Sequence, residues 1–258
     1  MFCHWGPETH LRGRDVTTAE TERATSTAEA HGHSHRDVSG GRLRPAVFGA
    51  MDGLVTNVAL IAGVGGGGGA ARTIVLTGLA GLAAGAFSMA AGEYISVKSQ
   101  NELISAEVDV ERRELARNPE GERDELAETL HARGVDLGLA RQVAEQLSRH
   151  PEQALDVHVR EELGVAHDDL PSPWTAAVFS FVCFSIGAVL PLVPYLLGYA
   201  SLPVSLGIGA ATALAGGGVV AGVTGRPVWR GAFRQFLFAA LAVAATYAVG
   251  LLVGGTVA

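Results

Sequence analysis

Acidic residues are missing from the last third of the chain, since no aspartate or glutamate follows residue 170. Charged residues occupy only 17% of the 258 positions, whereas 48% are hydrophobic. Mean hydropathy is therefore positive, which is typical of membrane proteins when the apolar residues cluster in long runs. They do cluster here, so a water-soluble globular enzyme is a poor match for the composition.

Cysteine and basic charge are also scarce. Cys3 lies in a polar stretch and Cys183 in an apolar run, so we expect no disulfide between them and no secreted disulfide framework. The net charge is −7, and most aromatic residues lie in apolar runs, which excludes a nucleic-acid-binding protein. Residues 1–43 contain no apolar run, so we expect no cleaved signal peptide.

Five segments are long and apolar enough to cross a bilayer, which takes about 17–25 residues. They predict an all-α, polytopic membrane protein with five transmembrane helices. Pro191, Pro194 and the run Gly216–Gly218 are expected to break or bend the later spans. The predicted spans are residues 45–65, 73–97, 173–197, 202–223 and 232–256.

Residues 1–43 are predicted to be a disordered tail. The tail contains His31, His33 and His35 at alternate positions, a pattern that either captures metal loosely or is only low-complexity sequence. The remaining divisions predicted are residues 44–98 for the first two spans, 99–170 for a small inserted domain, and 171–258 for the last three spans.

No break signal ends the second span, so its helix is expected to continue out of the membrane. Gly81 and Gly85 have a spacing that lets helix backbones approach closely, either within the subunit or at a dimer seam. The domain that follows, residues 99–170, is strongly acidic, with 18 acids and 8 arginines.

Turn and cap residues divide this inserted domain into short helices. Asn118-Pro119 ends one helix and starts the next, with asparagine as its N-cap. Gly134 is a plausible end of that helix, Asp136 an N-cap for a third helix near 137–149, and Pro151 the start of a fourth that ends before Gly164.

The orientation is predicted from arginine and lysine near the span ends. With the N-terminus in the cytoplasm, the basic residues gather inside, and the acidic domain is cytoplasmic too. The exception is Arg72. The residues that define this pattern are Arg42, Arg44, Lys98, Arg226, Arg230 and Arg234.

Two acids lie within the spans, Asp52 and Glu93. A carboxylate in hydrocarbon costs at least about 2.5–3.5 kcal/mol, so it usually lines a pathway or has a partner. Lys98 could neutralise Glu93 at the membrane interface. Asp52 is therefore the stronger candidate for a functional carboxylate within the spans. Met89 shares a helix face with Glu93, and its thioether favours transition metals over Mg²⁺, although ordinary packing also explains a methionine. Asn57 and Ser88 could add oxygens.

The inserted domain carries two ExxE pairs, Glu111 with Glu114 and Glu122 with Glu125. Each pair places two carboxylates on one helix face, and folding the two helices together could gather all four. His158, Glu161 and Glu162 on the last helix could close the cluster. Oxygen-rich clusters of this kind bind divalent cations.

Two other interpretations of these acids stay open. The glutamates could simply pair with neighbouring arginines on solvated helix faces. A di-iron oxidase would need two ExxH motifs on four long helices, whereas the chain offers one clear instance, Glu128 with His131.

The sequence resembles the vacuolar iron transporter family from about residue 44 to its C-terminus. The resemblance lies in three segments: MDGLVTNVALIAGV at 51–64, SMAAGEYISVKSQNEL at 88–103 and ALDVHVREELGV at 154–165. It implies five spans, a homodimer with the path at the interface, and export of ferrous iron, often also manganese, from the cytosol by proton antiport. No prosthetic group is implied.

The family's pathway aspartate and methionine match Asp52 and Met89. Its metal-binding glutamates match both ExxE pairs and then Glu162, with Glu161 as the alternative. Where some members have methionines near that last glutamate, this chain has His158 and Val159. Two functions compete with transport: a membrane-anchored metal buffer or oxidase, and an apolar-solute permease. The membrane is expected to be the cell membrane, or a vacuolar-type membrane in a eukaryote.

Overall fold

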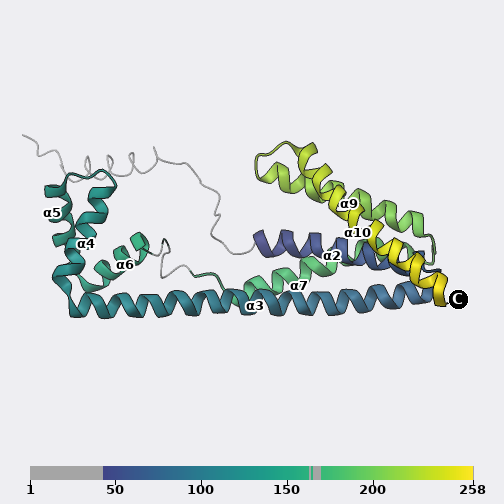
Figure 1. Cartoon of the computed structure of the whole chain (residues 1–258), viewed down its shortest axis with the longest axis horizontal. Helices are drawn as coiled ribbons and strands as arrows, with labels where there is room; N and C mark the ends of the chain where they lie inside the picture. Colours follow the sequence, from purple (N-terminus) through teal and green to yellow (C-terminus); the bar gives the residue numbers. More distant parts are fainter. Residues whose placement is uncertain (1–42, 163, 165–169, 258) are drawn as a thin grey trace, which may run out of the picture. The chain divides into compact units, whose positions relative to one another are not determined.

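The computed structural model describes residues 43–162, 164 and 170–257. The chain divides into two units, residues 1–38 and 39–258, and the first, with the predicted tail and its three histidines, lies outside the described residues. Every regular element in the described part is helical (Figure 1). The all-α prediction is therefore confirmed.

Five helical segments are long and apolar enough to cross a membrane, which confirms the predicted number and makes the chain an integral membrane protein. The third is interrupted: a 3₁₀ turn, η2, separates its long first part from one further helical turn, α8. The segments are α2 (Leu43–Gly66), α3 (Ala71–Arg117), α7–η2–α8 (Pro173–Val189, Leu190–Leu192, Val193–Leu196), α9 (Leu202–Val223) and α10 (Val228–Val257).

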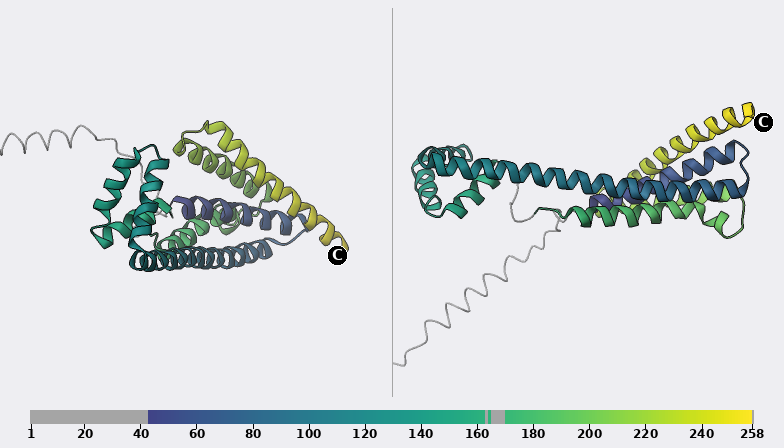
Figure 2. Two further views of the ribbon diagram at one scale, coloured as in Figure 1. Left: turned by 60° about the vertical axis from the view of Figure 1, so that its left-hand side comes forward. Right: turned by 90° about the horizontal axis from the view of Figure 1, so that it is seen from below.

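The helix α3 serves both halves of the fold. It has 47 residues and is about 70 Å long at 1.5 Å per residue, whereas the hydrocarbon core of a bilayer is only about 30 Å thick. Figure 2 shows it running unbroken from the spans to the short helices at its far end. The expectation that the second span continues out of the membrane is confirmed.

Three short helices follow α3: α4 (Pro119–Ala132), α5 (Leu137–Leu147) and α6 (Pro151–Glu162). Their boundaries follow the predicted caps. The Gly121 N–H donates to Asn118 Oδ1 at 3.2 Å, and the Gly138 N–H donates to Asp136 Oδ1 at 2.9 Å. Gly134 has a φ of +98°, as expected of a residue that terminates a helix.

The helix α2 lies among the other spans and contacts α3, α7, α9 and α10. Glycines permit this packing, because a Cβ on Gly53 would overlap the Phe184 backbone. On α3, Gly81 faces Leu60 of α2, and Gly85 faces the Phe184 ring. Of the two roles proposed for the glycine pair, the structure therefore shows close packing within the subunit.

The break in the third span lies at Pro191, one of the two predicted positions. Side chains from neighbouring helices compensate for it, because Asn57 Nδ2 donates to the Ala188 carbonyl and Ser205 Oγ donates to the Pro191 carbonyl. At Gly216–Gly218, by contrast, α9 continues without interruption, so no break occurs there.

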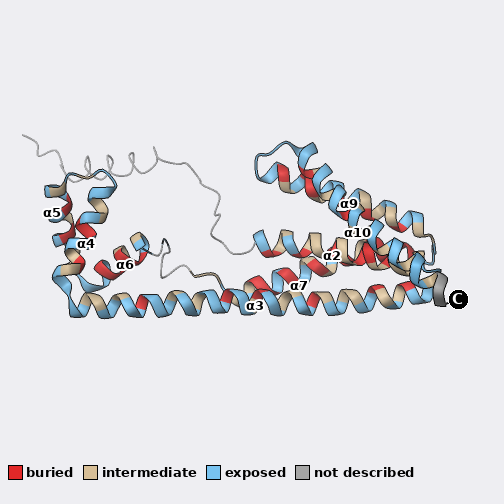
Figure 3. Ribbon diagram, in the orientation of Figure 1, coloured by how far each residue is buried: buried red, intermediate tan, exposed pale blue. Residues whose placement is uncertain are grey.

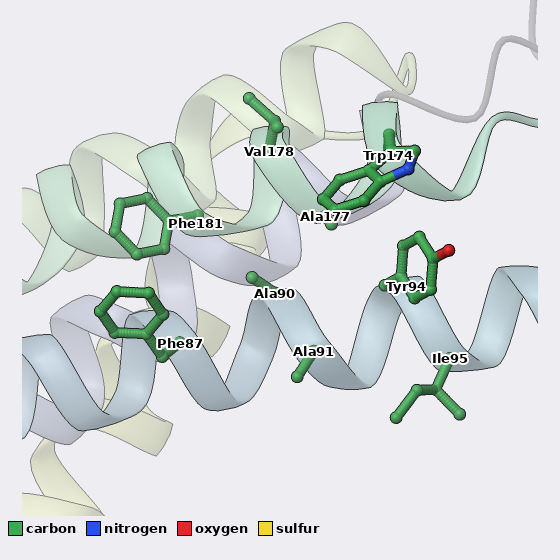
Figure 4. Close-up of a pocket in the computed structure, with 9 residues that line it drawn as sticks. All are labelled: Phe87, Ala90, Ala91, Tyr94, Ile95, Trp174, Ala177, Val178 and Phe181. Atoms are coloured by element: carbon green, nitrogen blue, oxygen red, sulfur yellow. The ribbon is translucent and has the colours of Figure 1, made fainter.

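An apolar groove with a volume of about 450 Å³ lies between α3 and α7. Aromatic pairs join the two helices along it (Figure 4): Phe87 with Phe181 at 5.2 Å between ring centroids, and Tyr94 with Trp174 at 4.9 Å. Tyr94 and Trp174 lie where α7 begins. Contacts of this kind stabilise helix pairs beyond the area they bury, and they anchor the membrane part of α3, from which the short helices project.

Candidate metal site

Four potential metal ligands meet where the short helices pack on α3. Glu111 comes from α3, Glu122 from α4, and His158 and Glu162 from α6, and each offers an atom within 4.8 Å of the others. His158 lies at the centre. Its Nδ1 is 3.1 Å from Glu111 Oε1, 3.5 Å from Glu162 Oε1 and 3.7 Å from Glu122 Oε2.

The cluster forms because two small cores hold its helices in register. Val108 of α3 packs with Leu155 and Val159 of α6, which brings the turn with His158 against Glu111. Leu126 of α4 packs with Ala140 of α5 in the second core. The Asn118 cap starts α4 directly after α3, so the first acid of each ExxE pair turns toward α6.

Burial distinguishes this cluster from a solvated charged face. The His158 side chain is only 1% exposed, Glu111 13% and Glu122 11%. The Nε2 atom of His158 is buried with no hydrogen-bond partner among the described residues. An imidazole fixed among three carboxylates would be costly without a cation or proton between them, so the arrangement is suited to binding a cation.

Repulsion among the carboxylates of the cluster also favours the binding of a cation. Burial, and then the charges of Glu162, Glu122, Glu125 and Glu114, raise the pKa of Glu111 to about 7. Burial also raises the pKa of Glu122, an effect that His158 opposes. A divalent cation would relieve this repulsion among carboxylates, because it supplies the missing positive charge.

The other predicted ligands lie outside the central group. Glu114 is half-exposed and forms an ion pair with Arg117 at 3.5 Å, and Glu125 is exposed. Both are still near enough for their charges to raise the pKa of Glu111. They form the rim of the cluster.

The final pair of glutamates divides between two roles. Glu162 belongs to the central group, whereas Glu161 forms an ion pair with Arg133, at the end of α4. The sequence analysis missed this role for Arg133, because the two residues are far apart in the chain and no spacing rule joins them.

The ExxH motif that a di-iron centre would use is not part of the cluster. Glu128 is exposed on α4, and His131 Nδ1 lies 2.8 Å from the Val135 carbonyl oxygen at the end of the same helix. Among the described residues, the cluster around His158 is the one group of three or more potential metal ligands, and neither Glu128 nor His131 belongs to it.

The predicted pathway residues lie on α2 and α3. Asp52 is half-buried on α2, and the Thr56 side chain hydrogen-bonds to it one turn further along. Met89 packs against the cluster of Ala86 and Phe184 between α3 and α7. Ordinary packing, the simpler interpretation of Met89, therefore describes its contacts within one subunit.

Glu93 is buried on α3, with 8% of its surface exposed. Lys98 forms its ion pair with Glu102, at 3.7 Å, rather than with Glu93. The ion pair with Glu93 that Lys98 could form is therefore absent among the described residues, where the lysine lies one turn from Glu102 on the same helix face. Ser88 is exposed.

The structure is that of a helical membrane protein that carries an acidic, imidazole-containing cluster of potential metal ligands on an extension of its second span. Residues 43–251 match the VIT family. The chain belongs to this family.

Curated relatives agree with this assignment. The chain is 36% identical over 228 residues to a vacuolar iron transporter of Acanthamoeba castellanii, covering 86% of this chain and 83% of the relative. It is 30% identical over 227 residues to vacuolar iron transporter 1 of Oryza sativa, covering 85% and 90%, and 31% identical over 183 residues to vacuolar iron transporter 1 of Arabidopsis thaliana, covering 70% and 73%.

Proposed function

We propose that this protein exports Fe²⁺, and also Mn²⁺, from the cytosol in exchange for protons. The observation that carries the proposal is the cluster of three glutamates around the buried His158, in a chain whose relatives are named iron transporters. Carboxylates with one imidazole suit Fe²⁺ and Mn²⁺, since imidazole favours transition metals over Mg²⁺ and Ca²⁺.

The two halves of the protein have different tasks in this proposal. The cluster on α3, α4 and α6 collects metal, with Glu114 and Glu125 concentrating cations at its rim. Asp52 alternates between metal and proton, which lets one carboxylate couple the two fluxes. Met89 and Glu93 line the rest of the path, with Met89 turned to it at the interface of a homodimer.

The proposed topology places the N-terminus and the cluster in the cytoplasm. Arg44, Lys98 and the three arginines at the α9–α10 turn support it, because positive residues flank the cytoplasmic ends of spans. The membrane is then the cell membrane, or a vacuolar-type membrane in a eukaryotic cell.

Metal-driven proton movement in proteoliposomes tests the proposal. Wild-type protein should move Fe²⁺ and Mn²⁺ with a coupled pH change inside the vesicles, and Mg²⁺ should give none. Asp52→Asn should abolish both fluxes while Mn²⁺ binding to the purified protein persists. Wild-type rates in a folded Asp52→Asn variant would show that this carboxylate does not couple the fluxes.

A membrane-anchored metal buffer is the second candidate. It is favoured by one observation, that the cluster is complete within one subunit and includes no residue of the predicted spans. The buffer would bind metal normally but move neither metal nor protons across the vesicle membrane. Glu122→Gln separates the two functions, because it should weaken binding in both cases but slow a flux only in a transporter.

A further inference from the structure

Three arginines project from the turn between α9 and α10 and from the first turns of α10: Arg226, Arg230 and Arg234. All three are exposed. In the turn that presents them, Gly225 adopts a φ of +68° and the Arg226 N–H donates to the Ala221 carbonyl at 2.8 Å. We call these three residues the basic patch.

Among the residues that the structure describes, the basic patch forms no ion pair with an acid. No aspartate or glutamate follows residue 170. In the acidic domain, Arg133 and Arg160 are paired with acids, whereas among the described residues Arg44 and Arg72 near the span ends, like the basic patch, are in no ion pair. The patch therefore keeps its full positive charge available for a ligand.

An apolar stripe runs beside the basic patch on α10. Trp229, Phe233 and Leu237 follow at four-residue intervals, and each is more than half exposed, with Trp229 at 67%. The Arg230 guanidinium carbon lies 5.2 Å from the centre of the Trp229 ring, so charge and aromatic surface adjoin directly. Figure 3 shows that α10 is exposed along most of its length.

The length of α10 places the patch at the depth of lipid headgroups. Its 30 residues extend about 45 Å, whereas the hydrocarbon core is about 30 Å thick. Arginine is costly in hydrocarbon, so the excess length lies at the arginine end. The guanidinium groups then meet lipid phosphates, with Trp229 and Phe233 at the same depth and Leu237 one turn closer to the acyl chains.

We propose that the basic patch and its apolar stripe form a binding site for an anionic phospholipid. The arginines bind the phosphate and the negatively charged headgroup, Trp229 and Phe233 pack beside the headgroup, and Leu237 contacts the start of an acyl chain. Charge complementarity and the adjoining apolar stripe together favour a lipid over a soluble anion. The site depends on the membrane embedding of α10 and is independent of whether the protein transports metal.

The test measures which lipid lies next to Trp229. The other tryptophans are changed to phenylalanine (Trp5→Phe and Trp174→Phe), and the full-length protein is reconstituted in phosphatidylcholine vesicles. Quenching of Trp229 by brominated phosphatidylglycerol is compared with quenching by brominated phosphatidylcholine. Because each arginine near an anionic membrane surface contributes about 1 kcal/mol, replacing one with glutamine should lower the preference for phosphatidylglycerol about fivefold.

Matched variants control the experiment. Arg72→Gln removes an exposed arginine at the other end of the spans and should leave the preference unchanged. The triple lysine variant of the basic patch keeps the charge and should retain most of the preference. Native mass spectrometry of the same proteins should show phosphatidylglycerol retained by wild type and lost from the triple glutamine variant, which gives a second readout.

Four results would overturn the proposal. Two of them are equal quenching by both lipids and a preference that survives the triple glutamine variant. The third is loss of the preference on adding inorganic phosphate at constant ionic strength, which would identify a site for soluble phosphate. The last is a preference for phosphatidylglycerol that emerges only when the glutamates of residues 99–162 are neutralised. That result would indicate that the acidic domain, and not a lipid, occupies the basic patch.

Discussion

Metal binding by the cluster should depend steeply on pH near neutrality, and Glu111 should be the main cause. Its pKa is about 7, because it is buried and faces four other carboxylates. Below pH 7 it carries a proton that a divalent cation must displace. For one such group the apparent affinity falls about tenfold between pH 8 and pH 6, since each pH unit below the pKa is a factor of ten.

The folding stability of the metal-free protein should change with pH in the opposite direction to the metal affinity. The pKa of Glu111 in the folded protein lies above its ordinary value of 4.5. Its contribution to folding stability is therefore fully present below pH 4.5 and is lost as the pH rises through about 7. Metal should restore that stability at high pH, so the shift of the melting temperature by Mn²⁺ should be larger at pH 8 than at pH 6.

Isothermal titration of full-length protein with Mn²⁺ measures this directly. At pH 7, buffers of different ionisation enthalpy should report release of about half a proton per metal from this group. Glu111→Gln should bind more weakly at every pH and lose the steep pH dependence. The exposed Glu128→Gln is the matched control and should titrate as wild type. A wild-type affinity that is flat from pH 6 to pH 8, or an unchanged slope in Glu111→Gln, would refute the reasoning.

Two further predictions concern the centre of the cluster and the packing of the spans. Pulsed EPR of bound Mn²⁺ should show nitrogen coupling that disappears in His158→Gln and persists in the surface variant His150→Gln; if His158→Gln keeps it, the imidazole is not a ligand. Gly53→Ala should lower the melting temperature sharply, because its Cβ would overlap the backbone of α7. Gly92→Ala, with nothing within 4 Å of the added Cβ, should not, and equal melting temperatures would contradict the packing described.

The sequence was sufficient for the architecture because its strongest signals are local. Long apolar runs give the spans, and Asn118 and Asp136 cap the helices that they were predicted to cap. The spacing of Gly81 and Gly85 predicts that another helix approaches α3 closely, but it does not predict which helix that is. The partner depends on which helices meet in space, and that information is not contained in one segment.

The candidate site was predictable in composition but not in arrangement. The ExxE spacing shows which carboxylates share a helix face, yet it treats both acids of a pair alike. How α3, α4 and α6 pack together places Glu111 and Glu122 at the centre and Glu114 and Glu125 at the rim. The same packing buries His158. Arg133 then decides between the last two glutamates, through an ion pair that only the folded chain defines.

The unbroken course of α3 also fixes the distance between the cluster around His158 and the span residue Met89. Met89 and Glu111 lie on one rigid rod, 22 residues and therefore about 33 Å apart. Charges in water are screened beyond about 8 Å at physiological salt. In the proposed transport mechanism, an ion released by the cluster would therefore diffuse to the span residues rather than pass directly between ligands, and the cluster would act as a local reservoir.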